Sequence, residues 1–166
     1  MNQDSSPNTE VQIESLGRSS YRLTTEVTLP RPRAEVFQFF ADAANLEKIT
    51  PDFLNFRILT PLPIEMKTDA RIEYKIRLRG IPIKWRTNIS AWQPNERFVD
   101  EQIRGPYRKW HHEHLFQDLG EQTLMTDIVN YRVWLAPVLH PLMVKRDLLR
   151  IFQYRQDKIV ELFGNP

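Results

Sequence analysis

The 166-residue chain contains no cysteine and only five glycines. Without a thiol there is no disulfide and no cysteine nucleophile, and so few glycines leave little room for phosphate-binding loops. The motifs G-x-S-x-G, G-x-x-x-x-G-K, G-x-G-x-x-G and C-x-x-C are all absent. The sequence therefore indicates no nucleotide or other cofactor, and we expect none.

Long apolar runs and a concentration of one charge are also missing. No stretch approaches the ~20 apolar residues of a membrane-spanning helix, and the first residues lack the pattern of a signal peptide. The net charge is +2 and the isoelectric point about 9.0, but cations and acids are interleaved along the chain. A nucleic-acid binder more often gathers its cations on one face. We therefore expect a cytoplasmic protein with no membrane span and no nucleic-acid partner, and the oligomeric state stays open.

Residues 1–18 are polar and show no apolar period, so we expect a flexible N-terminal leader. Residues 19–166 are enough for a single domain. Within that domain the apolar pattern and the turn residues predict one strand, two short helices and six further strands. The first strand is expected at 21–29, and the two short helices at 33–42 and 42–49. The six further strands are expected at 53–60, 71–79, 83–92, 97–104, 107–117 and 123–135.

The segment from Pro141 to Phe163 contains neither glycine nor an internal proline, and its apolar residues recur at helical spacing. It predicts one long amphipathic helix, which must bury its apolar stripe. The strands, separated by turn signals about every ten residues, predict an antiparallel meander. We therefore expect an α+β helix-grip fold, in which a curved antiparallel sheet of about seven strands wraps around the C-terminal helix and leaves a cavity.

Trp110, His112, His114 and Phe116 alternate with other residues in the run Y-R-K-W-H-H-E-H-L-F. In an extended strand alternate side chains share one face. A strand of the core would carry Val, Ile or Leu there, and a solvent face would not carry aromatic residues at both ends. Two imidazoles between two aromatics therefore predict the wall of a polar-lined pocket.

The same alternation selects further candidates on the other strands and on the last helix. Arg155 lies within the apolar stripe of that helix, and since a buried carboxylate needs a partner, we expect it to pair with Asp127 or Asp100. A one-residue slip in register would turn the strand residues toward water, and structural polar networks are the plainer alternative. The predicted apolar walls are Tyr74, Trp85, Trp110, Phe116 and Phe152, and the predicted polar contacts are Asp100, Gln102, His112, His114, Asp127, Tyr131 and Arg155.

Several segments carry a family resemblance that covers residues from about 20 to 163. They read L-P-R-P-R-A-E-V-F-Q-F-F-A-D-A-A-N-L-E-K-I-T-P, R-G-I-P-I-K-W-R-T, F-V-D-E-Q-I-R-G-P-Y-R-K-W-H-H-E-H-L-F, M-T-D-I-V-N-Y and R-I-F-Q-Y-R. With this order of elements, the chain resembles the START/SRPBCC superfamily of helix-grip proteins, which includes polyketide cyclases. Within it, the chain is similar to the bacterial ligand-binding SRPBCC group, whose members are sometimes labelled cyclase/dehydrase or are fused to epimerase domains. The resemblance implies a small hydrophobic or amphipathic ligand, and association with an epimerase-type enzyme is a further expectation.

The favoured function is the binding of such a ligand, lipid or polyketide-like, between the sheet and the C-terminal helix. The alternative is a cyclase or dehydratase in which His112 or His114 acts with Asp127 as acid and base. The two histidines are also candidate metal ligands, with Asp127 or Asp100 as a third, but two clear ligands fall short of a usual site and we expect no metal. Residues 135–141 are apolar and are interpreted as a portal over the cavity, a packed connector or a partner surface.

Overall fold

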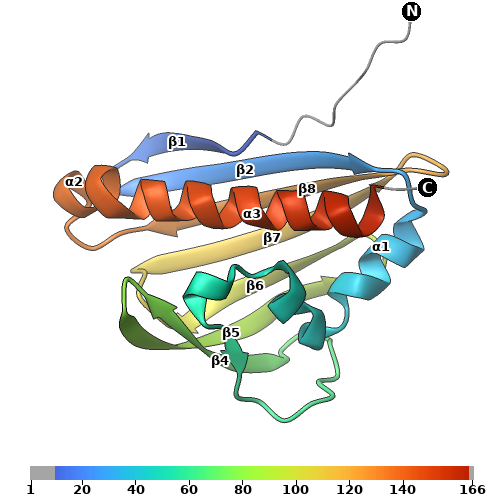
Figure 1. Cartoon of the computed structure of the whole chain (residues 1–166), viewed down its shortest axis with the longest axis horizontal. Helices are drawn as coiled ribbons and strands as arrows, with labels where there is room; N and C mark the ends of the chain where they lie inside the picture. The colour runs from blue at the N-terminus through green and yellow to red at the C-terminus, as the bar shows by residue number, and fades with distance from the viewer. Residues whose placement is uncertain (1–9, 165–166) are drawn as a thin grey trace, which may run out of the picture.

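Eight strands of the described chain form one antiparallel sheet in the order β1-β2-β8-β7-β6-β5-β4-β3 (Figure 1). The structure is a computed structural model that describes residues 10–164. Pairing of β2 with β8 brings the first and last thirds of the chain together. The strands from β3 to β8 form a meander, in which each strand pairs with the next one in the sequence. The strands are β1 (Gln12–Gly17), β2 (Ser20–Leu29), β3 (Arg57–Ile58), β4 (Arg71–Leu78), β5 (Ile81–Gln93), β6 (Arg97–Arg104), β7 (Lys109–Asp118) and β8 (Thr123–Arg132).

The helices all lie on one face of this sheet (Figure 1). The long helix α3 runs alongside β2 and β8. Helix α1 and the short turns η1 and η2 cover the strands toward the other edge. Side chains along β8 alternate strictly between buried and half-buried, which shows that one face of the strand meets the helices. The helices are α1 (Arg33–Phe40), the 3₁₀ turns η1 (Ala43–Ile49) and η2 (Asp52–Leu54), α2 (Ala136–Leu139), the π-helical turn η3 (His140–Val144) and α3 (Lys145–Phe163).

The predicted helix-grip fold is confirmed, with eight strands instead of about seven. Strand β6 has the predicted bounds, and the long C-terminal helix is present. Asp42 begins η1 by accepting a hydrogen bond of 2.9 Å from the backbone N–H of Ala44. No helix within residues 10–164 is long and apolar enough to cross a membrane.

The N-terminal prediction is wrong for part of its range. Residues 12–17 were expected in a flexible leader, but they form β1, which pairs antiparallel with β2 at the edge of the sheet. An edge strand is held by its backbone hydrogen bonds and needs few apolar side chains, so its polar sequence carries no clear period. The folded unit therefore includes residues before 19, and residues 1–9 of the predicted leader lie outside the described chain.

Two other segments differ from the predicted elements. The strand expected at 53–60 is reduced to β3, because Asp52–Leu54 forms a 3₁₀ turn and Asn55 adopts a left-handed conformation at φ 44°. The loop expected at 135–141 is helical and continues through η3 into α3. Pro137 lies in the first turn of α2, where a missing N–H costs nothing, and the π turn contains Pro141, which removes a helical hydrogen bond.

Candidate functional site

A cavity of about 180 Å³ lies between the inner face of the sheet and α3. Its wall is mainly apolar and is formed by β4 to β7, by η1 and η2, and by one face of α3. Small-molecule pockets usually combine such a wall with a few convergent polar groups. The predicted site residues that line this cavity are Tyr74, Trp85, Asp100, Trp110, His112, His114, Phe152 and Arg155.

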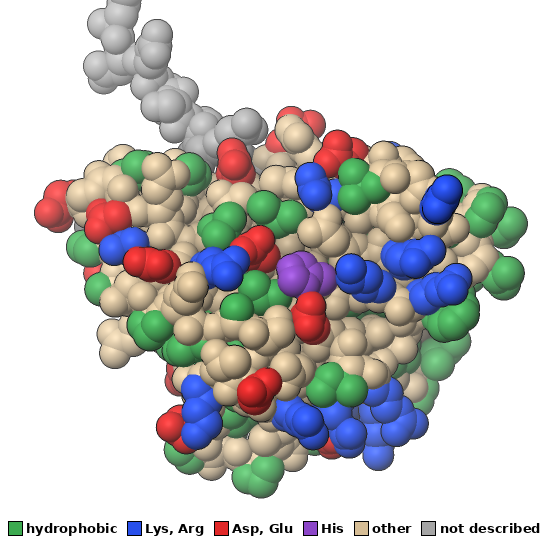
Figure 2. All heavy atoms as spheres, turned by 180° about the vertical axis from the view of Figure 1, so that it is seen from behind, with side chains coloured by type: hydrophobic (Ala, Val, Ile, Leu, Met, Phe, Trp, Pro, Cys, Tyr) green, Lys and Arg blue, Asp and Glu red, His purple; other side chains and the backbone are tan. Residues whose placement is uncertain are grey.

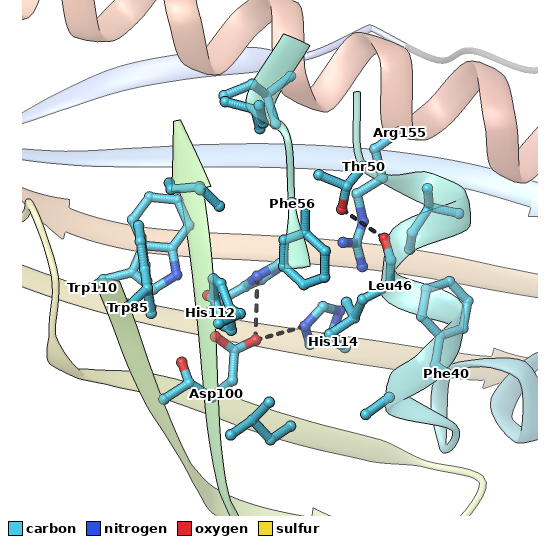
Figure 3. A pocket seen from close by; sticks show the side chains of 18 of the residues that line it. Phe40, Leu46, Thr50, Phe56, Trp85, Asp100, Trp110, His112, His114 and Arg155 are labelled. Carbon is cyan, nitrogen blue, oxygen red and sulfur yellow. Dashed lines mark hydrogen bonds and ion pairs between the residues drawn. The ribbon is translucent and has the colours of Figure 1, made fainter. Parts of the chain in front are cut away.

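Strand β7 places His112 and His114 side by side on its buried face (Figure 3). The two imidazole centroids are 3.8 Å apart. In the ladder with β6, Asp100 is the direct partner of His112, and in the ladder with β8, Asp127 is the direct partner of His114. The predicted inward orientation of this strand face is confirmed, and each histidine receives a carboxylate from a neighbouring strand.

Both carboxylates contact both imidazoles. His112 Nε2 lies 3.1 Å from Asp127 Oδ1, and His114 Nε2 lies 3.0 Å from Asp100 Oδ2, both with hydrogen-bond geometry. The remaining ring nitrogens lie at ion-pair distance, with His114 Nδ1 2.7 Å from Asp127 Oδ1 and His112 Nδ1 3.4 Å from Asp100 Oδ2. Figure 3 shows the two contacts of Asp100 as dashed lines. The four side chains thus form a closed ring of alternating imidazoles and carboxylates.

Arg155 extends this ring from α3. Its Nε lies 3.5 Å from Asp127 Oδ2, so the predicted pairing of Arg155 with Asp127 is confirmed. The guanidinium also lies over the ring of Phe40, 5.6 Å from its centroid. Within residues 10–164, Arg155 Nε and Nη2 are buried and have no hydrogen-bond partner. The guanidinium therefore supplies charge to Asp127 through Nε, while Nη2 remains a buried donor without a partner among the described residues.

Burial and neighbouring charges drive the pKa values of the two histidines in opposite directions. Burial opposes the charged form of His114, but the carboxylates of Asp127 and Asp100 outweigh burial and raise its pKa. For His112, burial and the positive charge of His114 lower the pKa below its ordinary value despite both carboxylates. Of the two imidazoles, His114 is therefore the one that is protonated first as the pH falls.

The carboxylates are ionised in the same ring. Burial works to raise the pKa of Asp127, but Arg155 and His114 outweigh it and hold that pKa well below its ordinary range. Burial likewise opposes ionisation of Asp100, whose pKa is nevertheless lowered by the two histidines. When His114 is protonated, the two carboxylates, the guanidinium and the imidazolium sum to zero charge. This balance is the physical reason that the ring can lie in the interior.

Asp100, His112 and His114 are also the residues that could hold a metal ion. One ligand atom from each lies within 4.8 Å of the others. Two histidines and a carboxylate suit zinc or non-haem iron, and Asp127 would bind the far sides of both rings as metal-ligating histidines require. Two of these side chains are also hydrogen-bonded to each other, His114 to Asp100, while the third, His112, is hydrogen-bonded to Asp127.

Four predicted site residues do not line the cavity. Phe116 packs against Phe37 and Phe40, with centroids 5.2 and 5.5 Å apart, because α1 fills the space at that end of β7. Asp127 is fully buried beneath the histidines and acts only through its neighbours. Neither Phe116 nor Asp127 therefore belongs to the cavity wall, and contact of either residue with a ligand stays a prediction.

Gln102 and Tyr131 are also engaged elsewhere. The side-chain amide of Gln102 donates to the carbonyl oxygen of Tyr107 at 2.7 Å and accepts from its N–H at 3.2 Å. This double contact fits tightly around Gly105, where an added Cβ would meet Gln102 Oε1 at 2.2 Å. The hydroxyl of Tyr131 lies 2.9 Å from His140 Nε2, underneath η3. Neither residue lies in the cavity wall, because contacts within the chain occupy these polar groups, and their contact with a ligand stays a prediction.

Sequence reasoning missed the part of the cavity wall that comes from short helical turns. Leu46 of η1, Thr50 directly after it and Leu54 of η2 line the cavity. Short 3₁₀ turns bury single residues without a repeating period, so no pattern announces them. Leu148 and Ile151 of α3 also line the cavity, and these could have been found from their spacing to Phe152 and Arg155 on one helix face.

Comparison with solved structures supports the fold. A START superfamily protein from Mycobacterium smegmatis matches with a TM-score of 0.67 at 15% identity, over 86% of this chain and 97% of that one. Protein Ms6760 from Mycobacterium smegmatis matches with a TM-score of 0.65 at 17% identity, over 93% and 96%. Zhui aromatase/cyclase from Streptomyces sp. R1128 matches with a TM-score of 0.63 at 12% identity, over 86% and 96%. At these identities the likeness shows the fold alone.

Comparison by sequence identifies the family. No curated protein sequence matches the chain. The family model described as polyketide cyclase/dehydrase and lipid transport matches residues 29–153, from the end of β2 into α3. That span holds the ring of histidines and aspartates and most of the cavity wall. The resemblance seen in the sequence is thus confirmed: the chain belongs to the polyketide cyclase/dehydrase and lipid transport family, within the SRPBCC proteins.

Proposed function

We propose that the cavity binds a small hydrophobic or amphipathic molecule, lipid or polyketide-like, whose acceptor oxygen faces Arg155. One observation carries this proposal. Two cavity-lining side chains, Trp85 and Arg155, hold buried N–H donors that have no partner within residues 10–164. A buried donor left unpaired costs about 1–3 kcal/mol, so a ligand oxygen that accepts from it recovers that free energy.

The remaining wall suits the apolar part of such a ligand. Trp85 and Trp110 lie edge to face with centroids 5.4 Å apart, and Phe152 faces Trp110 from α3. Tyr74 stacks on Trp85 at 5.8 Å. Aromatic side chains of this kind offer a large apolar surface at a small entropic cost. The family description, which includes lipid transport, supports the same class of ligand.

The charge of the ring favours an uncharged acceptor. When His114 is protonated, it sums with Asp100, Asp127 and Arg155 to zero charge, and a carboxylate ligand would then leave one negative charge uncompensated in the interior. A ketone, ester or hydroxyl oxygen accepts from Arg155 without that cost. We therefore place carbonyl-bearing lipids and polyketide-like ketones ahead of free fatty acids.

A second candidate function is acid–base catalysis of the cyclase or dehydratase type. The opposite pKa shifts of His112 and His114 favour it, because a neutral imidazole beside a protonated one is a matched base and acid. Zhui, a structural relative, is named an aromatase/cyclase. All four ring nitrogens, however, already face carboxylate oxygens. Binding without catalysis is therefore the preferred proposal.

Localisation in the cytoplasm and association with an epimerase-type enzyme stay predictions.

The test is native mass spectrometry of the freshly purified protein, with elemental analysis of the same sample. We expect an organic adduct that is released on denaturation, and a lower occupancy in Arg155→Met. An empty protein that also takes up no added ketone would overturn the proposal. Turnover of a supplied polyketide ketone, with a rate break near pH ~6–7 that His114→Ala abolishes, would establish the enzymatic alternative instead.

A further inference from the structure

The helical segment that leads into α3 exposes an unusual number of apolar side chains. Leu135 is 77% exposed, Leu142 68%, Val138 59% and Trp134 58%. Val138 and Leu142 are four residues apart and share the outer face of α2 and η3, and Leu135 lies in the turn directly before α2. We refer to Trp134, Leu135, Val138 and Leu142 as the end patch.

The inner face of the same segment is already occupied. Ala136 and His140 are buried against the sheet, and the ring of His140 stacks on Tyr21 with centroids 3.5 Å apart. The exposed side of the segment is therefore apolar, whereas a helix at a water surface normally turns polar residues outward. Packing within the described chain accounts for the inner face and leaves the outer face without a partner.

Positive charge borders the end patch. Residues 128–146 contain neither Asp nor Glu, and the outer face of the helix changes from apolar to basic at Lys145 and Arg146. Arg108, from the turn before β7, lies over the Trp134 ring at 5.3 Å from its centroid. Figure 2 shows hydrophobic side chains gathered at the right-hand end of the molecule, with Lys and Arg side chains beside them.

The tip of the β4–β5 hairpin lies at the same end (Figure 1). Arg79 donates from Nε and Nη2 to the Asp147 carboxylate at 2.8 and 2.9 Å, which fastens the hairpin to the beginning of α3. Ile81, two residues further along the hairpin, is 65% exposed. The carboxylate of Asp147 is thus matched by Arg79 and does not offset the cations beside the end patch.

We propose that the end patch docks on a lipid membrane surface that contains anionic headgroups. Exposed Leu, Val and Trp side chains enter the boundary between headgroups and acyl chains, and neighbouring Lys and Arg side chains contact the lipid phosphates. A second copy of the chain fits less well. A twofold contact through the end patch would bring Arg108, Lys145 and Arg146 of both copies together, with no acid from the segment to match them.

The cavity wall reaches toward this end of the molecule. Leu148 and Ile151 line the cavity just beyond Lys145 on α3, and Leu78 and Tyr107 line it beside the hairpin tip and Arg108. A protein docked through the end patch therefore holds this side of the cavity close to the bilayer. The docking proposal stands on exposure and charge, so it does not depend on what the cavity binds.

The test is co-sedimentation of the full chain with vesicles, either phosphatidylcholine alone or with about a third of phosphatidylglycerol. We expect binding to the anionic vesicles that weakens as salt is added. Leu135→Ser/Leu142→Ser should weaken it at least tenfold, and Lys145→Glu/Arg146→Glu by a similar factor. The matched control is Leu59→Ser/Leu119→Ser, which removes two leucines that are each 45% exposed elsewhere and should bind as the unmodified chain does.

Three outcomes would overturn the proposal. One is no sedimentation with anionic vesicles at low salt. Another is equal loss in the control double variant, which would make the effect nonspecific. The third is a dimer in solution that Leu135→Ser/Leu142→Ser dissociates, because the end patch would then be an interface between copies. Since all the substituted residues are exposed, their thermal midpoints should match the unmodified chain, which separates loss of docking from loss of fold.

Discussion

His112 and His114, the two inward-facing histidines of β7, are chemically identical, and only their surroundings separate them. His114 has the closer carboxylate contacts, at 2.7 and 3.0 Å, while those of His112 are 3.1 and 3.4 Å. The rings are too close for both to be charged at low cost, so the proton goes to the better-matched one. The two neighbouring imidazoles therefore titrate as a coupled pair, in which His114 is protonated before His112.

This arrangement predicts how stability depends on pH. The pKa of His114 is raised from 6.5, so its contribution is complete below pH 6.5 and is lost as the pH rises through the folded pKa. The pKa of His112 is lowered from 6.5, so stability falls as the pH drops from 6.5 through its folded pKa. Urea unfolding between pH ~5 and ~9 should therefore show maximal stability near pH ~6.5. His114→Gln should flatten the alkaline side, and an unchanged alkaline slope in that variant would contradict the assignment.

The two carboxylates should differ in their contribution to folding. Asp127 is fully buried and pairs with Arg155, whereas the Asp100 side chain is 18% exposed at the cavity. Asp127→Asn removes the counter-charge of a buried guanidinium and should cost about 3–5 kcal/mol of unfolding free energy. Asp100→Asn is the matched comparison and should cost clearly less. The measurement is urea unfolding at neutral pH. Equal losses of unfolding free energy in the two variants would show that the deeper burial of Asp127 does not make it more important for stability than Asp100.

At the scale of elements, alternation predicted the strands well, and helical spacing predicted α3. The ladder partners Asp100–His112 and His114–Asp127 were foreseeable as a group, because each residue shares a face with apolar neighbours. Which of them touch the cavity was not foreseeable. Phe116 alternates as regularly as Trp110, yet α1 packs onto Phe116 and leaves Trp110 at the cavity. Such differences arise from packing between distant elements, which no local pattern encodes.

The contact of α3 with β2 contains a buried polar pair. Gln156 Nε2 donates to Thr25 Oγ1 at 2.5 Å, both side chains are fully enclosed, and Gln156 Oε1 has no partner among the described residues. Thr25→Val should cost about 1–3 kcal/mol, because it leaves the whole amide of Gln156 unpaired. Thr25→Val/Gln156→Leu should recover most of that loss, since both polar partners are then replaced by apolar groups. A double-mutant cycle by urea unfolding measures this coupling, and additive losses would contradict it.

At the scale of the whole molecule, the cavity couples the ligand to folding. The sheet and α3 meet tightly at the phenylalanine cluster of α1 and again beneath η3, and the cavity lies between these two regions. A ligand that fills it binds only the folded chain, so its binding free energy adds to stability. This also explains why the sequence could predict a cavity but not its occupant. Many of the side chains that line the cavity belong to β4 to β7 and can be read from the strand pattern. The volume of the cavity, in contrast, depends on the distance between α3 and the sheet.

A matched pair of small probes tests this coupling and the role of Arg155 together. At 100 times its dissociation constant a ligand adds about 2.7 kcal/mol, which for a domain of this size raises the thermal midpoint by roughly 5–10 °C. Octan-2-one should produce a larger shift than octane at equal free concentration, because its carbonyl oxygen accepts from the unpaired Nη2 donor of Arg155. In Arg155→Met the two probes should become equivalent, since the donor that the proposal assigns to the carbonyl oxygen is removed. If octan-2-one kept its advantage in that variant, the acceptor would have to bind elsewhere in the cavity, for example at Trp85 Nε1, and Trp85→Phe would then remove the difference instead.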